Sequence, residues 1–408
     1  MRNVIVIGGG PAGLMAAGTA AKNGNNVTLI EKNDIVGKKL LITGRGRCNI
    51  TNACEDVEEL INNVTTNGSF MYSAFYGFTN HDTIEFFNSI GVKTKVERGN
   101  RVFPESDKSK TVADALENWV KKCGVKIVFD TVLDLISEKD MVKGVILKNR
   151  GKLFSDSVII ATGGVSYPKT GSTGDGYKWA KKLGHTIVEP KPSLAPLDTK
   201  EEWSFKLAGL SLKNISIKFF NEKNKKVYED FGEMMFTHTG LTGPVVLSAS
   251  ANLQPMESEK YRAEIDLKPA LSEKQLDERI QRDFAKNLNK NLDNALDELL
   301  PKNLIAPIIS LSGLDGKKKV NSVTKEERRI LMENIKHLKF TILDFGPIDQ
   351  AIVTSGGISV NEIDPGTMES KVVKNLYFAG EVIDVDAYTG GFNLQVAFST
   401  GYVAGSSV

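Results

Sequence analysis

The amino-terminal segment constrains the fold most strongly. Asn3 to Ile7 is a short apolar, β-branched run, which predicts a buried parallel strand. A glycine-rich turn from Gly8 to Gly13 follows, and Leu14 to Lys22 is an alanine-rich, helix-favouring stretch. Val27 to Ile30 predicts a second strand. This order of strand, glycine turn, helix and strand predicts a βαβ unit.

The turn has the spacing G-x-G-x-x-G, with Gly8, Gly10 and Gly13 in the motif positions. Gly8 permits the tight turn, Gly10 lets the backbone approach a pyrophosphate, and Gly13 lets helix and strand pack closely. The helix N-terminus offers free N–H groups to phosphate. Glu31 follows Gly13 by 18 positions, where an acid can accept hydrogen bonds from a ribose. We therefore predict a dinucleotide site; the alternative is a glycine turn without a ligand.

Two more strands are expected to end in glycine turns. Val158 to Ile160 leads into Ala161-Thr162-Gly163, and Asn375 to Ala379 leads into Gly380-Glu381. A small-residue helix through Ala404 follows Gly391. Its N-terminus would stabilise the negative charge of a reduced flavin, which favours FAD over NAD as the bound dinucleotide.

A basic loop spans residues 37–52 and holds four cations, three glycines and two asparagines. Glycines free backbone N–H groups and cations neutralise phosphate, so the loop is expected to follow the pyrophosphate towards the flavin. The alternative is a solvated loop. Cys48 within it is either an acid near the flavin or a small buried hydrophobe.

Composition excludes several classes of protein. The 408 residues carry 52 basic and 50 acidic side chains, a balance that gives no general reason to bind nucleic acid. No apolar run approaches the ~20 residues of a membrane span. Three cysteines and four scattered histidines suggest neither a disulfide framework nor a metal site. We expect a cytoplasmic protein with no membrane and no metal; the oligomeric state stays open.

The periodicity changes in the middle of the chain. Leu212 to Phe219 alternates with period two, and residues 233–237, 245–248 and 261–267 are expected to be similar strands. Apolar residues then recur every fourth position from Leu276 to Leu296, which predicts one amphipathic helix that begins after Ser272 and ends at Pro301. A shorter helix is expected from Thr324.

These patterns predict an α/β protein. A Rossmann-like FAD-binding domain is expected over residues 1–190 and 351–408, an inserted antiparallel β-barrel domain over 191–270 and 336–350, and a nested helical domain over 271–335.

The chain resembles the BaiN/RdsA-like bacterial flavoproteins, also called aminoacetone-oxidase-type FAD-binding proteins, over essentially its full length. The resemblance rests on the following stretches: Gly8–Gly13, Gly46–Asn52, Arg101–Pro104, Ser166–Pro168, Thr170–Gly176, Phe236–Pro244, Thr354–Ile358 and Phe378–Asp386. Ala387-Tyr388 departs from the glycine expected first in many relatives, which weakens transfer of any one relative's substrate.

The resemblance and the motifs together give a set of expected cofactor residues. They are Gly8, Gly10, Pro11, Ala12, Gly13, Glu31, Lys32, Lys38, Thr43, Gly44, Arg45, Gly46, Arg47, Asn49, Val132, Ala161, Thr162, Gly163, Gly380, Glu381, Asp384, Gly391, Phe392, Asn393, Leu394 and Gln395. Glu381, Asp384 and Asp386 are expected either to bond ribityl hydroxyls or to cap the following helix. The loop from Thr170 to Gly176 is either a pyridine-nucleotide loop or a plain turn.

The resemblance implies a flavin reductase or oxidase, and reduction of an activated C=C is the favoured reaction. NADH or NADPH would reduce FAD, N5 would transfer hydride, and an acid would protonate the neighbouring carbon. The favoured substrate is a uridine of 23S rRNA, held by three cationic clusters at residues 38–47, 223–226 and 317–319. The alternatives are a conjugated steroid, aminoacetone, or a non-enzymatic FAD-bound sensor. His238, Arg101 and Tyr167 are candidate catalytic residues. His238 would protonate or polarise the substrate, with a structural histidine as the alternative, and Arg101 and Tyr167 would line the substrate side.

Overall fold

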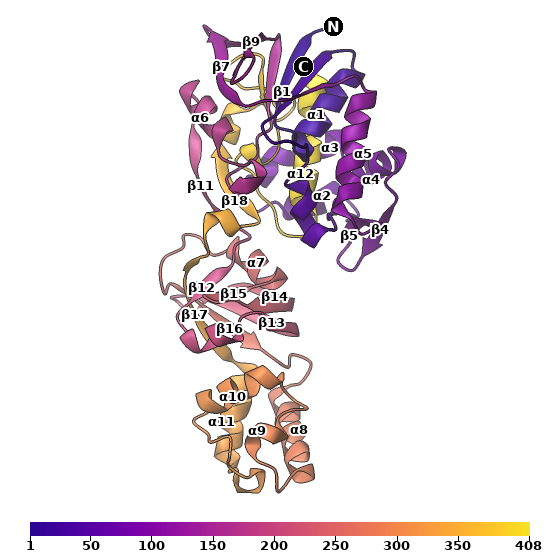
Figure 1. The fold of residues 1–408 in the computed structure, drawn as a ribbon. Helices are drawn as coiled ribbons and strands as arrows, with labels where there is room; N and C mark the ends of the chain where they lie inside the picture. Colours follow the sequence, from indigo (N-terminus) through magenta and orange to yellow (C-terminus); the bar gives the residue numbers. More distant parts are fainter. The chain divides into compact units, whose positions relative to one another are not determined.

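The computed structural model describes all 408 residues, which form two compact units (Figure 1). The first unit comprises Met1–Ser193 and Ile348–Val408, and the second comprises Leu194–Pro347. Each unit has its own cluster of buried apolar side chains. Both chain ends lie in the first unit, where the Asn25 side-chain amide donates a hydrogen bond to the Val408 carbonyl (3.1 Å).

The first unit contains a five-stranded parallel sheet with the strand order β19-β10-β1-β2-β6. Its strands are β1 (Asn3–Ile7), β2 (Asn26–Glu31), β6 (Lys126–Phe129), β10 (Ser157–Ile160) and β19 (Leu376–Phe378). The three strands next to one another at its centre are almost entirely buried, as expected for parallel strands covered on both faces.

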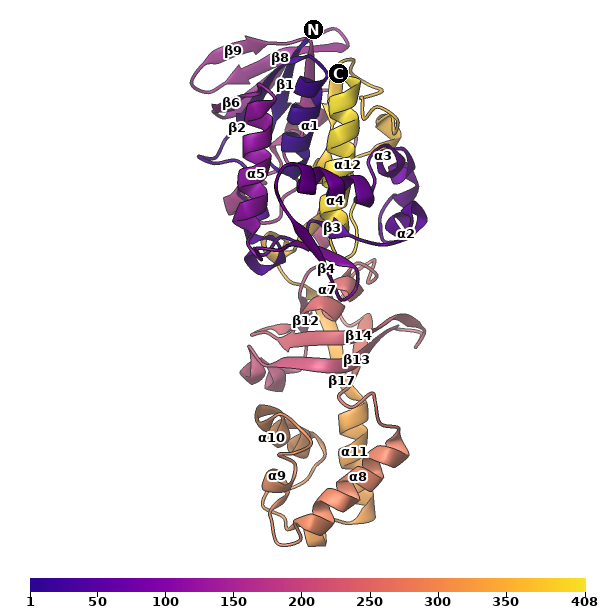
Figure 2. The ribbon, with the colours of Figure 1, turned by 90° about the vertical axis from the view of Figure 1, so that its right-hand side faces the viewer.

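Two glycine-containing helices pack against each other in this unit: α1 (Pro11–Lys22) and α12 (Phe392–Ser407). Figure 2 shows α12 running beside α1, although most of the chain separates them. The remaining helices of the unit are α2 (Val57–Asn62), α3 (Tyr72–Gly77), α4 (Asn80–Ser89), α5 (Ser109–Lys122) and α6 (Asp175–Lys182). Helix α5 also packs on α1, so the parallel sheet carries a helical layer.

Three smaller antiparallel sheets complete the first unit. They are formed by β3 (Thr51–Asn52), β5 (Arg101–Pro104) and β4 (Thr94–Glu97); by β7 (Val132–Glu138), β8 (Met141–Leu147) and β9 (Gly151–Phe154); and by β11 (Ile187–Ser193) with β18 (Val353–Ile358).

The second unit contains a closed barrel with the order β12-β15-β14-β13-β16-β17. Its strands are β12 (Leu197–Thr199), β13 (Ser211–Asn221), β14 (Lys226–Phe236), β15 (Gly240–Thr242), β16 (Tyr261–Asp266) and β17 (Leu338–Phe345). All of its pairings are antiparallel. Alternate side chains of β16 are buried, as a half-exposed barrel strand requires.

Residues 245–248 are helical, so the expectation of a strand there was wrong. They lie in α7 (Pro244–Ser250), which begins with Pro244 in its first turn after Gly243. Proline with a preset φ is favoured at the first helical position, and this start signal outweighs the β-branched pair Val245-Val246.

The helical segment between β16 and β17 consists of α8 (Glu273–Lys286), α9 (Leu292–Ala295), α10 (Lys302–Leu311) and α11 (Lys325–Lys336). Helices begin after Ser272 and Thr324 as expected, and each of these two residues forms a capping box. The single long helix was wrong, because the chain leaves the helix at Asn287 and Leu288 is 53% exposed. Asparagine competes for backbone hydrogen bonds and favours helix ends, and residues 287–291 contain three of them.

Candidate cofactor site

Three strands of the parallel sheet end at the same edge. Ile7 of β1 is in register with Ile160 of β10, and Ile160 is in register with Phe378 of β19. The segments that follow begin at Gly8, Ala161 and Ala379, so the three glycine turns expected from the sequence meet at the carboxyl edge of the sheet. Ligands bind at this edge in open α/β sheets.

The amino-terminal glycines differ in how much space surrounds them. A Cβ added at Gly13 would lie 1.8 Å from the Gly8 carbonyl oxygen, and one at Gly8, whose φ is +106°, would lie 2.4 Å from the Ala161 carbonyl oxygen. A Cβ at Gly10 would meet no atom within 4 Å. Gly8 and Gly13 therefore serve close packing, whereas Gly10 leaves open space before the first turn of α1, the turn formed by Pro11 and Ala12.

The carboxyl-terminal motif packs directly on this turn. A Cβ at Gly380 would lie 2.7 Å from the Ala12 Cβ, and a Cβ at Gly401 would lie 2.5 Å from the Ala12 carbonyl oxygen. One turn further along, a Cβ at Gly405 would lie 2.4 Å from the Ala16 carbonyl oxygen. Helices α1 and α12 thus touch through their backbones, and the two ends of the chain converge at one place.

Glu31, expected to bind a ribose, is buried at the end of β2. Its Oε2 accepts a hydrogen bond from the Gly9 N–H (2.7 Å), and its Oε1 accepts from the backbone N–H (2.8 Å) and side-chain amide (2.6 Å) of Asn33. A carboxylate has about four acceptor sites, so capacity for a ribose hydroxyl remains. The Gly9 contact ties Glu31 to the glycine turn.

Lys39 and Glu381 form an ion pair (2.9 Å) between the basic loop and the carboxyl-terminal motif. Lys39 also donates to Ser166 Oγ (2.7 Å), while Glu381 accepts from the Thr354 N–H (2.9 Å) and from Ser166 Oγ (3.1 Å). Burial alone would raise the pKa of Glu381, but Lys39, Thr354 and Ser166 hold the pKa below its usual value. Glu381 is therefore a carboxylate, fixed in position by three elements.

Lys39 forms this ion pair, whereas the neighbouring Lys38 is the lysine that we expected from the sequence to bind the cofactor. Lys38 instead donates to Asn33 Oδ1 (3.3 Å) and lies 3.9 Å from Asp34. Both lysines follow Gly37 in a loop without a regular period, so their directions could not be assigned from spacing.

The other cations of the basic loop differ in their partners. Arg47 forms ion pairs with Glu97 and Asp107, and its guanidinium lies 4.1 Å from the centre of the Phe103 ring. Glu97 and Asp107 raise the pKa of Arg47. The guanidinium that we expected to bind phosphate is therefore already paired with two carboxylates. Arg45 is exposed and has a φ of +57°.

The loop also contains polar groups near Cys48. Thr43 Oγ1 donates to the Leu40 carbonyl (2.7 Å), and Asn49 Oδ1 is buried without a partner. Cys48 is fully buried, and burial raises the pKa of its thiol to about 12. Gly44 and Gly46 have positive φ, and a Cβ at Gly46 would meet no atom within 4 Å.

The start of α12 is held by its own side chains. The Asn393 amide donates to the Ala387 carbonyl (2.6 Å), and Asn393 Oδ1 accepts from the Ala387 N–H (3.0 Å). Gln395 is fully buried and bonds to Thr51 Oγ1 (2.6 Å) and the Phe78 carbonyl (3.2 Å). Both side chains fix the helix start from within. Phe392 is buried and Leu394 packs against the same core.

A Cβ at Gly391 would lie 2.4 Å from the backbone of Thr51, so the basic loop runs against the first turn of α12. Gly163 lies near Glu381, since its Cβ would be 3.7 Å from Glu381 Oε2. The Thr162 hydroxyl and Asp384 Oδ1 are buried without partners.

Lys32 and Val132, two further residues that we expected to bind the cofactor, follow β2 and β6 in the sequence. Lys32 donates to Thr173 Oγ1 (2.5 Å) and pairs with Asp175 (2.8 Å), which anchors the loop from Thr170 to Gly176 beside the end of β2. Val132 is buried at the start of β7.

The three candidate catalytic residues belong to different elements, and His238 belongs to the second unit. Arg101 is an exposed residue of β5 whose guanidinium donates to the Arg98 carbonyl (3.0 Å). Tyr167 has a φ of +49° and follows Ser166 of the Lys39 network; burial raises its pKa. His238 is exposed in the turn between β14 and β15 of the second unit.

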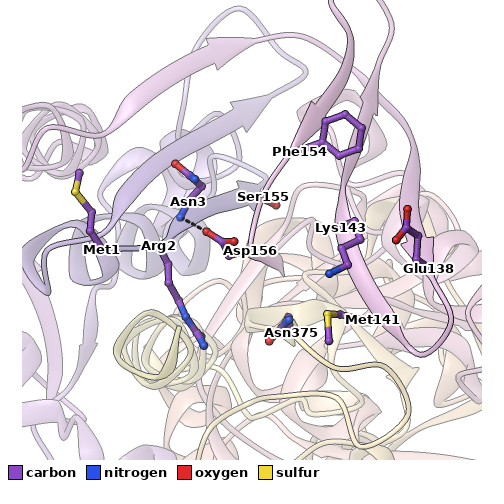
Figure 3. Close-up of a pocket in the computed structure, with 10 residues that line it drawn as sticks. All are labelled: Met1, Arg2, Asn3, Glu138, Met141, Lys143, Phe154, Ser155, Asp156 and Asn375. Carbon is purple, nitrogen blue, oxygen red and sulfur yellow. Dashed lines mark hydrogen bonds between the residues drawn. The ribbon is translucent and has the colours of Figure 1, made fainter.

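A cavity of about 620 Å³ lies elsewhere in the first unit, beside the amino-terminal ends of the strands (Figure 3). Its lining includes Met1, Arg2, Lys143, Phe154 and Asn375. Because it lies at the edge opposite the glycine turns, it is not the dinucleotide site.

The residues at the glycine edge fit FAD. The open space at Gly10 leaves the α1 N-terminus free for a pyrophosphate, and the unpartnered oxygens of Asn49 and Thr162 are buried polar groups that lack hydrogen bonds. No helix is long and apolar enough to cross a membrane, and no group of three or more His, Cys, Asp or Glu side chains is placed to hold a metal ion.

Solved structures share this fold. A 3-ketosteroid-Δ4-(5α)-dehydrogenase from Rhodococcus jostii RHA1 superposes with a TM-score of 0.55 at 15% identity, and the match covers 100% of this chain and 96% of that one. A 3-ketosteroid Δ1-dehydrogenase from Sterolibacterium denitrificans gives 0.52 at 13% identity, covering 99% and 98%.

The fold and the site define an FAD-dependent oxidoreductase. The family described as HI0933-like protein Rossmann domain matches residues 2–407, and the chain belongs to that family. This confirms the resemblance and the α/β fold class inferred from the sequence.

Three relatives match almost end to end. A 3-dehydro-bile acid Δ(4,6)-reductase of Clostridium scindens is 32% identical over 99% of this chain and 98% of its own length. A ribosomal RNA dihydrouridine synthase of Haemophilus influenzae is 31% identical over the same shares. A ribosomal RNA dihydrouridine synthase of Escherichia coli is 29% identical over 98% of this chain and 96% of its own length.

Proposed function

We propose that this chain is an NAD(P)H-dependent reductase of an activated C=C bond, and that its substrate is a uridine of 23S rRNA, which it converts to dihydrouridine. The observation that carries the proposal is the end-to-end match to two ribosomal RNA dihydrouridine synthases, since it includes the second unit as well as the cofactor unit. Bound FAD supplies the two-electron reducing chemistry that amino-acid side chains lack.

The residues of the chain bind and orient the cofactor in this proposal. The open turn at Gly10 receives the pyrophosphate, and Glu31 receives a ribose hydroxyl. The Lys39–Glu381 pair fixes the carboxyl-terminal motif against the basic loop. The N-terminus of α12, held by Asn393, directs a partial positive charge towards the flavin.

The second unit carries cations suited to RNA phosphates. Lys223 and Lys225 are exposed in the turn between β13 and β14, where Asn221 Oδ1 accepts from both backbone N–H groups. Neither side chain forms an ion pair, whereas Lys226 pairs with Glu229. Unpaired lysines in a fixed turn suit phosphate binding, which depends on counterion release.

The cationic loop of the helical segment is less available. Lys318 pairs with Glu327 (2.6 Å), Lys317 lies 3.6 Å from Asp293, and Lys319 donates to the Asn289 carbonyl (2.9 Å). We therefore assign the stronger RNA contact to the β13–β14 turn.

The first experiment deletes the gene in its host and measures dihydrouridine in 23S rRNA by mass spectrometry. The proposal predicts that one dihydrouridine disappears and returns with the wild-type gene. An unchanged dihydrouridine content would contradict the rRNA substrate.

A charge-reversal variant tests the RNA surface. Lys223→Glu with Lys225→Glu is expected to weaken rRNA-fragment binding by about 10-fold or more and to reduce the slope of log K against log salt by about 2. The matched control reverses two exposed lysines of the first unit, Lys122→Glu and Lys181→Glu. Equal losses in both variants would contradict a localised contact.

A second candidate function is reduction of a conjugated steroid, and the 32% identity to a bile acid reductase favours it. It predicts flavin reoxidation by a conjugated steroid ketone without RNA and without salt dependence. Stopped-flow absorbance of the reduced enzyme, mixed in turn with each substrate, distinguishes the two.

A further inference from the structure

The helical segment of the second unit is attached to the barrel by two connections. The chain leaves the barrel after β16 and returns to it at β17. The two connections contact each other, because the Leu267 N–H donates to the Ile335 carbonyl (3.0 Å). We call residues 264–273 and 335–338 the neck of the helical segment, since they hold this segment on the barrel.

Lys336 fastens one side of the neck. Its side chain pairs with Asp266 (2.5 Å) and donates to the carbonyls of Lys268 (3.2 Å) and Leu271 (2.7 Å). An ammonium group has three N–H donors, so these three acceptors use all of them. Lys336 therefore holds the chain that precedes α8, but it does not contact the helix itself.

His337 fastens the other side. Its Nδ1 lies 2.9 Å from Glu264 Oε1 of β16, and its Nε2 lies 3.3 Å from Glu273 Oε1 in the first turn of α8. An ionised carboxylate only accepts hydrogen bonds, so the ring can bond to both carboxylates only when both of its nitrogens carry protons. The geometry is that of an imidazolium between two carboxylates.

The elements around the ring carry further charged groups. These are Lys218 of β13 and Lys339 of β17, which are in register with Glu264, together with Lys268 of the neck and Lys336 and Glu333 of α11. Glu333 pairs with Arg329 (3.1 Å). Burial lowers the pKa of His337, but the hydrogen bonds and charges of Glu264 and Glu273 outweigh burial and raise the pKa above its ordinary value.

We propose that His337 is a pH-sensitive latch, whose imidazolium ties the start of α8 to the barrel strand β16 and whose loss of one proton releases α8. A neutral imidazole has one N–H and one acceptor nitrogen, so it keeps one carboxylate bond and turns a lone pair towards the other carboxylate. The Glu264 side chain is 16% exposed and has the shorter bond, whereas that of Glu273 is 62% exposed. The proton therefore stays on Nδ1, and the bond to Glu273 is the one that breaks.

The direction of the pH dependence follows from the raised pKa. Since the folded-state pKa of His337 lies above the unfolded value of about 6.5, the latch stabilises fully below the unfolded pKa and is lost as pH rises through the folded pKa. The bonds of Lys336 do not involve the ring, so the loosening is confined to the start of α8. The inference concerns the attachment of the helical segment and does not depend on the proposed reaction.

Hydrogen exchange of the FAD-loaded full chain, followed by mass spectrometry, measures the latch. Each rate is divided by the intrinsic exchange rate at the same pH. Peptides over residues 268–276 of wild type are expected to exchange about 3-fold faster at about pH 9 than at about pH 6, the size of effect that a partly exposed ion pair gives. His81→Gln, at an exposed position of α4, is the control and should keep this pH dependence.

Glu273→Gln separates the latch from simple packing. A glutamine side chain can accept from the imidazolium and can donate to the neutral ring, so the link persists in both states and exchange should stay slow at both pH values. Glu273→Ala removes the link at both pH values, so exchange should be fast and equally independent of pH. A pH dependence in Glu273→Gln equal to that of wild type would overturn the proposal.

NMR of the protein with ¹⁵N-labelled histidine follows the ring itself, which is assigned by the signal missing from His337→Gln. The wild-type ring is expected to titrate at a higher pH than the ring in Glu273→Gln, because that variant lacks one of the two carboxylates. Equal titrations would contradict the latch. A failure of the rRNA experiment would leave both results unaffected.

Discussion

Single residues connect the two ends of the chain at the glycine edge of the parallel sheet. Lys39 and Glu381 come from opposite ends of the sequence and form one ion pair, with Ser166 and Thr354 as additional partners. From the sequence we expected Glu381 and Lys38 to bind the cofactor, but we could not predict the pairing of Lys39 with Glu381, since a loop of mixed turns gives no period that assigns side-chain directions. Asn393 and Gln395 were correctly placed near the helix start, but their bonds could only be known from the fold.

Replacing Lys39 tests this pair. Lys39→Met is expected to destabilise the protein by about 1–3 kcal/mol at neutral pH, because it leaves the Glu381 carboxylate without its cation. With the cation present the pKa of Glu381 is depressed, so its contribution is present above the unfolded pKa and is lost as pH falls. Urea unfolding at several pH values measures both effects. Lys38→Met is the control and should change stability by less than about 0.5 kcal/mol.

Gly13 and Gly10 test two different requirements, close packing at Gly13 and space for a ligand at Gly10. Gly13→Ala is expected to destabilise the fold by about 1–3 kcal/mol, because its Cβ would overlap the Gly8 carbonyl. Gly10→Ala has space and a φ of −78°, so the apoprotein should keep its Tm while FAD binds about 10-fold or more weakly. Thermal unfolding and FAD titration read out the two variants. Unchanged FAD affinity in Gly10→Ala would place the pyrophosphate elsewhere.

The three cysteines are expected to differ in reactivity because they differ in exposure. Burial raises the pKa of all three thiols, to about 12 for Cys48 and Cys54, but only Cys123 is partly exposed. An alkylating reagent at neutral pH should therefore modify Cys123 first, and Cys48 only after unfolding. Peptide mass spectrometry over time measures the order. Rapid labelling of Cys48 in the native protein would revive its interpretation as an acid near the flavin.

Among the elements, the contact of α1 with α12 joins the two chain ends. Small residues allow this contact. An alanine-rich helix and a small-residue helix were both predicted from the sequence, but the contact between them was not. Strands β1, β2 and β10 were expected within a residue or so, because parallel strands are continuous apolar runs. Residues 245–248 and the region around Leu288 were misassigned, because local start and stop signals outweighed periodicity there.

A substitution in α12 tests the helix contact. Gly405→Leu is expected to lower stability by about 3 kcal/mol or more, since even a Cβ would lie 2.4 Å from the Ala16 carbonyl. Ser406→Leu, at the exposed neighbouring position, is the matched control. Chemical denaturation followed by circular dichroism compares them, and equal stabilities would contradict the close helix approach.

On the scale of the whole molecule, the sequence of the second unit interrupts that of the first. The two chain ends nevertheless lie together in the first unit. Along the sequence, helix–strand alternation gives way to apolar residues at every second position and then at every fourth position. These two changes of period predicted the barrel and the helical segment. The arrangement of strands in the barrel could not be predicted, because pairing between β12 and β17 depends on contacts across the whole insertion. The site itself follows from strand register, which places three sequence-distant turns at one edge.

The most direct test is the absorbance spectrum of the purified protein, combined with quantification of the released nucleotide. We expect a flavin spectrum and about one FAD per chain, either as purified or after addition of FAD. A protein without flavin absorbance that also fails to take up added FAD would contradict the convergence of both chain ends on this cofactor.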